Sequence, residues 1–117
     1  MKLNGAALSI LVAMCMAVSS PPSIAGSGQG TVSSVLVGRL GYQVYVQLTN
    51  ASFTGFACGN PNPSSWQWAF STQTQSGRDM LATVLAAKAT GVTLYVVGTN
   101  TCSQDPALED VAYVITG

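Results

Sequence analysis

The 117-residue chain contains no histidine, and only 7% of its residues are charged. The absence of histidine excludes the Ser-His-Asp and Cys-His arrangements that activate a nucleophile, and it removes the commonest side-chain ligand of metals. Of the four carboxylates, Asp79 fits the start of a predicted helix, whereas Asp105, Glu109 and Asp110 gather near the last predicted strand, where their simplest role is to keep that end soluble. Glycoside cleavage instead needs two acids across a cleft. We therefore expect no enzyme activity, no catalytic residue, no metal and no cofactor.

Positive charge is equally scarce. Beyond residue 25 there are three cationic side chains, Arg39, Arg78 and Lys88, against the four carboxylates. Binding to nucleic acid relies on a basic patch that neutralises phosphates, so we expect no nucleic-acid partner. Serine, threonine, asparagine and glutamine must keep the surface hydrated instead. Such a surface suits hydroxyl-rich ligands, although it is also common on exported proteins that have no ligand.

The first 25 residues have the pattern of a secretory signal peptide. Lys2 gives a positive start, Ala6–Val18 is mostly apolar, and Ser23-Ile24-Ala25 places small residues at a cleavage site. An apolar run of about 13 residues is shorter than the roughly 20 that cross a bilayer, so stable membrane insertion is not expected. We predict cleavage after Ala25 and a secreted or periplasmic product. The alternative is acylation of Cys15 at a lipoprotein site, but the preceding Met14 is larger than the residue such processing prefers.

Residues 26–117 are enough for a single domain and too few for two. They contain two cysteines, Cys58 and Cys102. An even pair in an exported chain normally forms a disulfide, and closing a loop of about 45 residues is worth on the order of 4 kcal/mol. The alternative, a zinc site, would need more ligands than two thiolates.

Strand patterns lie on both sides of one helical pattern. The predicted strands span Val32–Val37, Tyr42–Leu48, Trp66–Ser71, Val92–Val97 and Val111–Ile115. Gly38–Gly41 is predicted to turn the first two into a hairpin, whereas Asn50–Gly55 and Gly59–Ser65 are predicted loops. The fold class is therefore mainly β with one helix, in the order β-β-β-α-β-β.

The helix is predicted over Gly77–Thr90. Ser76 followed by Asp79 resembles a capping box at its start, and Gly91 fits the left-handed position after its last turn. An apolar stripe should pack on the sheet, extended by the aliphatic stem of Lys88. The predicted stripe residues are Met80, Leu81, Val84 and Leu85.

The second predicted strand alternates cleanly. Its core face should carry Tyr42, Val44, Val46 and Leu48, and its outward face Gln43, Tyr45 and Gln47. A phenol between two amides can hydrogen-bond to hydroxyl groups without adding charge, so these three residues are ligand-binding candidates. The alternative is a solvated polar face. If these residues bind a ligand, Tyr45→Ala should leave folding nearly intact and abolish that binding.

Trp66, Trp68 and Phe70 share one face of the third predicted strand. Aromatic rings can stack on sugar rings or fill a core. We expect core packing for Trp68 and Phe70. Trp66 adjoins the turn-rich segment and should be the more exposed tryptophan, which makes it the fourth ligand-binding candidate.

The predicted order of elements is that of OB-fold barrels, in which a helix closes one end of a five-stranded barrel. Several short motifs also occur in the order found in toxin B subunits of the subtilase-cytotoxin and typhoid-toxin type, which the chain resembles from Val32 to Ser103. They are Ala57-Cys58, Trp68-Ala69-Phe70-Ser71, Met80-Leu81, Leu85-Ala86-Ala87, Thr90-Gly91-Val92 and Thr101-Cys102-Ser103. The resemblance implies a disulfide-linked OB barrel that assembles as a ring of five and binds cell-surface glycans. The chain lacks the longer insertions of those subunits, and no sugar-binding residue matches one for one.

Two hypotheses follow. The chain is a secreted binding module, in the form of a glycan-binding subunit that uses Tyr45, Gln43, Gln47 and Trp66. Alternatively, it is a small exported structural or accessory protein whose barrel contacts a protein partner.

Overall fold

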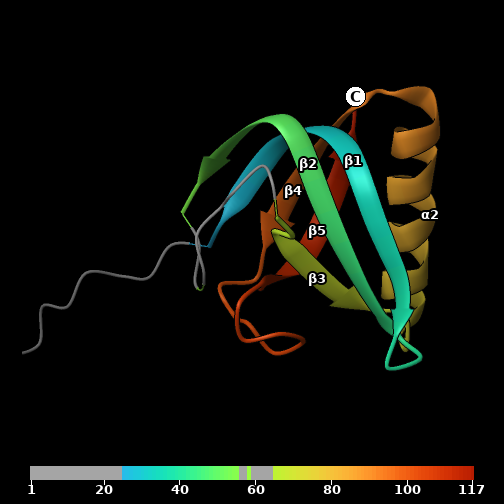
Figure 1. Cartoon of the computed structure of the whole chain (residues 1–117), viewed down its shortest axis with the longest axis vertical. Helices are drawn as coiled ribbons and strands as arrows, with labels where there is room; N and C mark the ends of the chain where they lie inside the picture. The colour runs from blue at the N-terminus through green and yellow to red at the C-terminus, as the bar shows by residue number, and fades with distance from the viewer. Residues whose placement is uncertain (1–24, 56–57, 59–64) are drawn as a thin grey trace, which may run out of the picture.

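The computed structural model describes residues 25–55, 58 and 65–117. Within these residues the order strand, strand, strand, helix, strand, strand is confirmed (Figure 1). The elements are β1 (Ser27–Arg39), β2 (Gln43–Thr54), β3 (Trp68–Ser71), α2 (Gln75–Thr90), β4 (Thr93–Gly98) and β5 (Glu109–Thr116). The described part of the chain is thus mainly β with one helix. The predicted signal peptide, apart from Ala25, and most of the predicted turn at Gly59–Ser65 lie outside the described residues.

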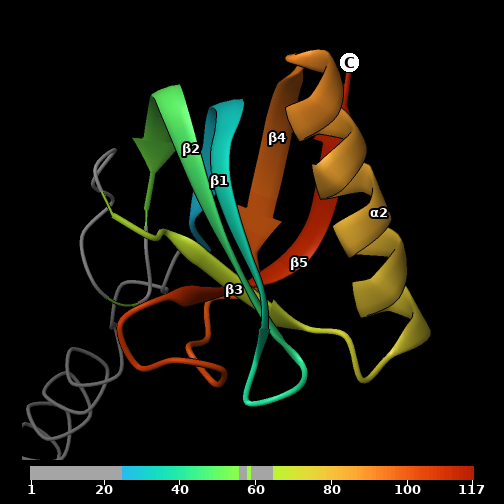
Figure 2. The same ribbon diagram turned by 45° about the vertical axis from the view of Figure 1, so that its right-hand side comes forward.

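The five strands form one closed sheet in the order β1-β2-β3-β5-β4, because β4 pairs back with β1. Four of the pairings are antiparallel, and β3 and β5 run parallel. The first five residues of β1, Ser27–Thr31, pair with β4, and all of them except Gly30 also pair with β2, so this strand closes the ring. Closure gives every strand two neighbours, which removes the free edges that invite aggregation. Helix α2 lies beside the closed sheet, against β1 and β5 (Figure 2).

The interior of the closed sheet is the main hydrophobic core. Val44, Val46 and Leu48 lie in it, as the alternation in β2 predicts, and Trp68 and Phe70 fill it from β3. The predicted core role of these two aromatic residues is therefore confirmed. Val84 and Ala87 of α2 complete the core from the helix side.

Strand β1 starts at Ser27, five residues before the predicted start at Val32. Glycine residues at the beginning of β1 favour a loop by local propensity. In the structure they let β1 pack closely against side chains of β2. A Cβ atom on Gly30 would lie 2.6 Å from the Cβ of Ala51, and one on Gly28 would lie 2.9 Å from the Phe53 ring. Tertiary packing thus overrides the local preference.

Strand β2 likewise continues to Thr54, through the segment Asn50–Gly55 that was predicted as a loop. Asn50 adopts a left-handed conformation with φ of 50°. The pairing register of β1 with β2 shifts nearby, between Gln29 and Thr31. A β-bulge of this kind bends a strand without ending it, so turn-forming residues persist inside β2.

The predicted hairpin turn at Gly38–Gly41 is confirmed. The Gly41 N–H donates to the Gly38 carbonyl at 2.9 Å, and Gly38, Leu40 and Gly41 all have positive φ. The predicted disulfide is also present: Cys58 is bonded to Cys102, with their Cα atoms 6.4 Å apart. No helix among the described residues is long and apolar enough to cross a membrane.

The prediction that Ser76 caps the helix is wrong. The helix starts at Gln75, and the Thr74 side chain caps it by accepting a 3.0 Å hydrogen bond from the Gly77 N–H. Asp79 instead accepts a hydrogen bond from the Gln75 side chain at 2.8 Å. Gly77 is buried against the Ser71 carbonyl, where no Cβ atom would fit, and this contact sets where the first turn lies. Gly91 ends the helix as predicted, with φ of 72°.

The buried stripe of α2 also differs from the predicted one. Val84 is fully buried, but Leu85 is 43% exposed and Ala87 occupies the neighbouring buried position. Met80 and Leu81 are partly buried against the core. Val84 and Ala87, three positions apart, therefore share the face of α2 that packs on the sheet, and Leu85 lies outside that face.

Candidate functional site

A hollow of 410 Å³ lies on the outer surface of the closed sheet. Four separate parts of the chain line it: the end of β1, the middle of β2, the residues just before β3, and the β4–β5 connection. The lining residues are Arg39, Tyr45, Ser65, Trp66, Asp105, Ala107 and Leu108.

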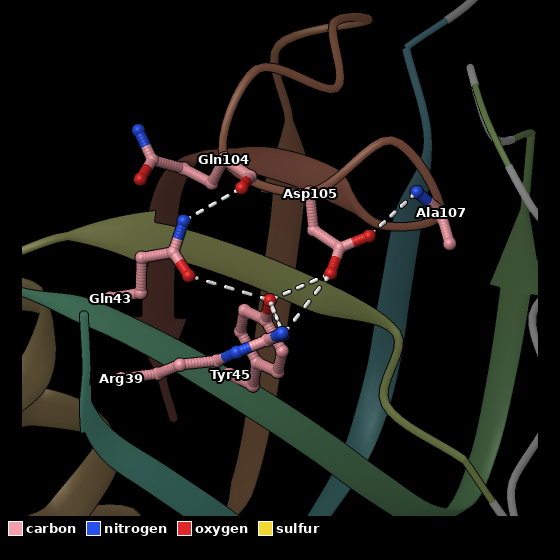
Figure 3. Close-up of polar contacts among 6 residues, drawn as sticks. All are labelled: Arg39, Gln43, Tyr45, Gln104, Asp105 and Ala107. Carbon is pink, nitrogen blue, oxygen red and sulfur yellow. Dashed lines mark hydrogen bonds and ion pairs between the residues drawn. The ribbon is translucent and has the colours of Figure 1, made fainter.

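Arg39, Tyr45 and Asp105 form a hydrogen-bonded chain along one wall of this hollow (Figure 3). The Tyr45 hydroxyl accepts a hydrogen bond from Arg39 Nη1 and donates one to Asp105 Oδ2 at 2.7 Å. The guanidinium also forms an ion pair with Asp105, since Nη1 lies 3.5 Å from Oδ2. In addition, the Arg39 Cζ atom lies 5.4 Å from the centre of the Tyr45 ring.

The β4–β5 connection is fixed to the sheet at two successive residues. Gln43 Nε2 donates to the Gln104 carbonyl at 2.7 Å, and Tyr45 holds Asp105 (Figure 3). Asp105 Oδ1 accepts a further hydrogen bond from the Ala107 N–H at 2.8 Å, which closes a tight turn. Gln43 and Tyr45 are two positions apart and therefore lie on the same face of β2. One face of this strand thus holds both attachment points.

The expectation that Gln43 and Tyr45 lie on a solvated face is wrong, because each is only 4% exposed. Both point away from the main core as predicted, but the β4–β5 connection covers them. Tyr45 packs there in a second hydrophobic cluster with Ala69 and Leu108. Tyr45 and Asp105 are 60 positions apart, so no local sequence pattern could predict that the β4–β5 connection covers Tyr45.

The network fixes the charge of its members. Burial raises the pKa of Tyr45, and the hydrogen bond to the Asp105 carboxylate raises it further. The same hydrogen bond lowers the pKa of Asp105, with help from the Ala107 N–H. At neutral pH the wall of the hollow therefore combines a neutral phenol with a paired carboxylate and guanidinium.

Trp66 supplies the aromatic surface of the hollow. It is partly buried, whereas Trp68 is fully buried, so the prediction that Trp66 is the more exposed tryptophan is confirmed. Its ring centre lies 6.1 Å from that of Tyr45, with the two planes at 61°. This edge-on contact holds the indole beside the phenol and leaves part of it facing the hollow.

The structure brings two of the four candidate ligand-binding residues to the hollow, Tyr45 and Trp66. Gln43 supports it from beneath, through the β4–β5 connection. Gln47 does not line it, and its backbone carbonyl accepts a hydrogen bond from Ser33 at 3.1 Å. Sequence reasoning missed Arg39 and Asp105 as members of the site. Their opposite charges, in a chain with so few, are the signal that could have paired them.

The remaining carboxylates of this region do not serve as solubilising charges. Glu109 is fully buried and Asp110 is 8% exposed, which corrects the expectation for both. Asp110 accepts hydrogen bonds from Thr101 and from the backbone N–H groups of Ser103 and Gln104. Burial alone would raise the pKa of Asp110, but these hydrogen bonds outweigh it and lower the pKa. Asp110 thus fixes the shape of the β4–β5 connection from inside.

The hollow thus places a partly buried indole beside a phenol and an ion pair. Among residues 25–55, 58 and 65–117, no group of three or more potential metal ligands comes together. The chain matches no family model, no curated protein and no solved structure. The resemblance to toxin B subunits therefore stays a prediction.

Proposed function

We propose that the chain is an exported, non-catalytic binding domain with an OB-fold, and that it binds a neutral, hydroxyl-rich ligand such as a cell-surface glycan in the hollow. The closed order β1-β2-β3-β5-β4, with β3 and β5 parallel and a helix between β3 and β4, supports the OB-fold assignment. The disulfide between Cys58 and Cys102 fits an oxidising compartment and supports export.

The location of the hollow carries the proposal. OB-folds bind oligosaccharides and oligonucleotides on the face of strands 2 and 3 and on the loops that join strands 1 to 2 and strands 4 to 5. Here Tyr45 lies in β2, Trp66 precedes β3, and Arg39 ends β1 at the β1–β2 turn. Asp105 comes from the β4–β5 connection. The hollow thus lies on β2 and the β4–β5 connection, next to the β1–β2 turn and the start of β3, which is where such a site is expected.

The charges favour a sugar over a nucleic acid. Arg39 is the cationic residue that lines the hollow, and Asp105 already neutralises it. A phosphate would meet the Asp105 carboxylate beside that guanidinium, which opposes binding. Hydroxyl groups can instead donate to the carboxylate and accept from the guanidinium, while a sugar ring stacks on Trp66.

A glycan array tests the proposal. The full chain is produced with export in a bacterial host, labelled, and applied to neutral and acidic oligosaccharides, with a labelled single-stranded DNA as the competing class. We expect binding to at least one neutral glycan, and a loss of ten-fold or more in affinity for Trp66→Ala. Tyr113→Ala is the matched control, because Tyr113 is a 51% exposed aromatic residue outside the hollow. Binding that survives Trp66→Ala, or binding to DNA alone, contradicts the proposal.

The accessory-protein hypothesis has one observation in its favour. Tyr95, Tyr113 and Ile115 are 37%, 51% and 50% exposed, and Tyr95 and Ile115 are cross-strand partners on the outer surface of β4 and β5. Exposed apolar side chains grouped in this way are typical of protein contacts. The native mass of the exported chain separates the two hypotheses. A stable pentamer supports the glycan-binding, toxin-subunit-like assembly, and a monomer that binds no glycan supports the accessory protein.

A further inference from the structure

The Glu109 side chain is an acidic group enclosed at one end of the closed sheet. Glu109 is the first residue of β5, pairs in register with Trp68 of β3, and is fully buried. Its Oε2 atom accepts a hydrogen bond from the Gly26 N–H at 2.8 Å and another from the Asn100 N–H at 3.3 Å. The Gly26 contact joins residues 83 positions apart in the sequence.

The backbone of Gly26 is closely fitted to this carboxylate. A Cβ atom at position 26 would lie 2.7 Å from Glu109 Oε1, and at position 98 one would overlap Oε2. The Gly26 carbonyl also accepts a hydrogen bond from the Gly98 N–H at 2.8 Å, which extends the pairing of β1 with β4 by one residue. The nitrogen of residue 26 is thus held in one place, directed at the carboxylate.

This nitrogen is also the atom that signal-peptide removal would change. Cleavage after Ala25 adds water across the Ala25–Gly26 peptide bond, leaving a carboxylate on Ala25 and an amine on Gly26. With an ordinary pKa near 8, that amine takes up a proton at neutral pH and becomes an ammonium group. A neutral amide donor 2.8 Å from Glu109 Oε2 would thereby be replaced by a cation with three hydrogens.

We propose that Glu109 is the buried counter-ion of the mature N-terminus, so that cleavage after Ala25 completes the fold by forming an ion pair with the Gly26 α-ammonium group. An ammonium group at Gly26 would replace a neutral donor to Oε2 with a charged one, and a charge-assisted hydrogen bond is the stronger of the two. Cleavage one residue earlier or later would move the cation by about 3.5 Å along the chain, out of register with the carboxylate. The inference rests on the proposed export and not on any ligand.

A double-mutant cycle tests the pair. The full chain carrying Lys88→Arg is exported, processed and purified, and mass spectrometry identifies its first residue. Lys88→Arg removes the remaining amine beyond residue 25, so that acetylation modifies the Gly26 nitrogen alone. The acetyl group has the shape of the missing Ala25 Cα and carbonyl. It therefore restores the uncut peptide bond and abolishes the charge without new bulk.

We expect acetylation to lower the midpoint of thermal unfolding by on the order of 5–10 °C when Glu109 is present. In Glu109→Gln, which keeps the shape and removes the charge, acetylation should have little effect. Equal shifts in the two backgrounds would overturn the ion pair and leave the proposed export intact. A first residue other than Gly26 would overturn the inference, and an uncut chain would overturn the export as well.

A second measurement covers the case in which Glu109→Gln does not fold. The pKa of the Gly26 amine in the processed protein, followed by NMR, should lie clearly above its ordinary value of about 8, because the carboxylate favours the charged form. A pKa at or below that value would overturn the proposal.

Discussion

The Tyr45 hydroxyl donates a 2.7 Å hydrogen bond to the Asp105 carboxylate across 60 positions of sequence. This bond fastens the β4–β5 connection to the outer face of β2 and turns an otherwise exposed strand face into the wall of a hollow. Arg39 joins the same two side chains from the end of β1. The buried phenol is therefore one of the groups that set the shape of the candidate site, together with Gln43 and Asp110.

Tyr45→Ala should be strongly destabilising. Because Tyr45 is 4% exposed and packs in the second hydrophobic cluster, removing its ring should lower the free energy of unfolding by about 3–5 kcal/mol. Tyr45→Phe keeps the ring and removes the hydroxyl, so its cost should be about 1–3 kcal/mol. Urea denaturation of both variants measures the difference. A nearly neutral Tyr45→Ala would instead support the solvated face expected from the sequence.

Stability should fall in acid through Asp105 and Asp110. Both carboxyls have a pKa below the ordinary value of 3.8, so the folded state holds their protons more weakly than the unfolded state does. Their contribution is therefore complete above that value and is lost as the pH falls through the lowered folded pKa values. Unfolding free energies measured from about pH 6 down to about pH 2 should decline less steeply for Asp110→Asn than for the unsubstituted chain. Asp79→Asn, which removes an exposed carboxylate on α2, is the matched control. Parallel curves for Asp110→Asn and the unsubstituted chain would contradict the prediction.

The two candidate helix caps can be separated by substitution. Thr74→Ala removes the acceptor of the Gly77 N–H and should cost about 1 kcal/mol, whereas Ser76→Ala should be almost neutral. Thermal unfolding of both variants, followed by circular dichroism, gives the comparison. A larger loss for Ser76→Ala would restore the capping box at Ser76.

Removing the disulfide should destabilise the domain substantially. Cys58 and Cys102 are separated by 44 positions, and the chain-entropy model gives about 4 kcal/mol for a loop of this length. The double variant Cys58→Ser and Cys102→Ser should therefore unfold at much lower urea concentration than the oxidised chain. Reduction of the unsubstituted chain should shift its midpoint by a similar amount. Equal midpoints for the oxidised and reduced chains would show that the bond does not contribute to stability.

The sequence predicted part of the candidate site. Trp66 was identified because its neighbours favour turns, and Tyr45 because it alternates with the core residues of β2. Neither pattern could show that residues 104–108 fold over Tyr45. Strand alternation predicts the face on which a side chain lies, but not whether another segment of the chain packs on that face. Arg39 and Asp105 were missed for the same reason: their pairing exists only once the β1–β2 turn and the β4–β5 connection meet.

Local sequence determined the order of the elements, the alternation that buries Val46, the left-handed glycine that ends α2 and the cysteine pair. These depend on residues a few positions apart or, for the disulfide, on the number of thiols present. Tertiary structure alone decided that Thr74 rather than Ser76 caps the helix, because Gly77 packs against the Ser71 carbonyl. It also decided that Glu109 is buried against Gly26, 83 positions away. The sequence does not show whether a carboxylate is hydrated or accepts a hydrogen bond from a backbone N–H. For Glu109, closure of the sheet decides this, because it brings Gly26 beside the carboxylate.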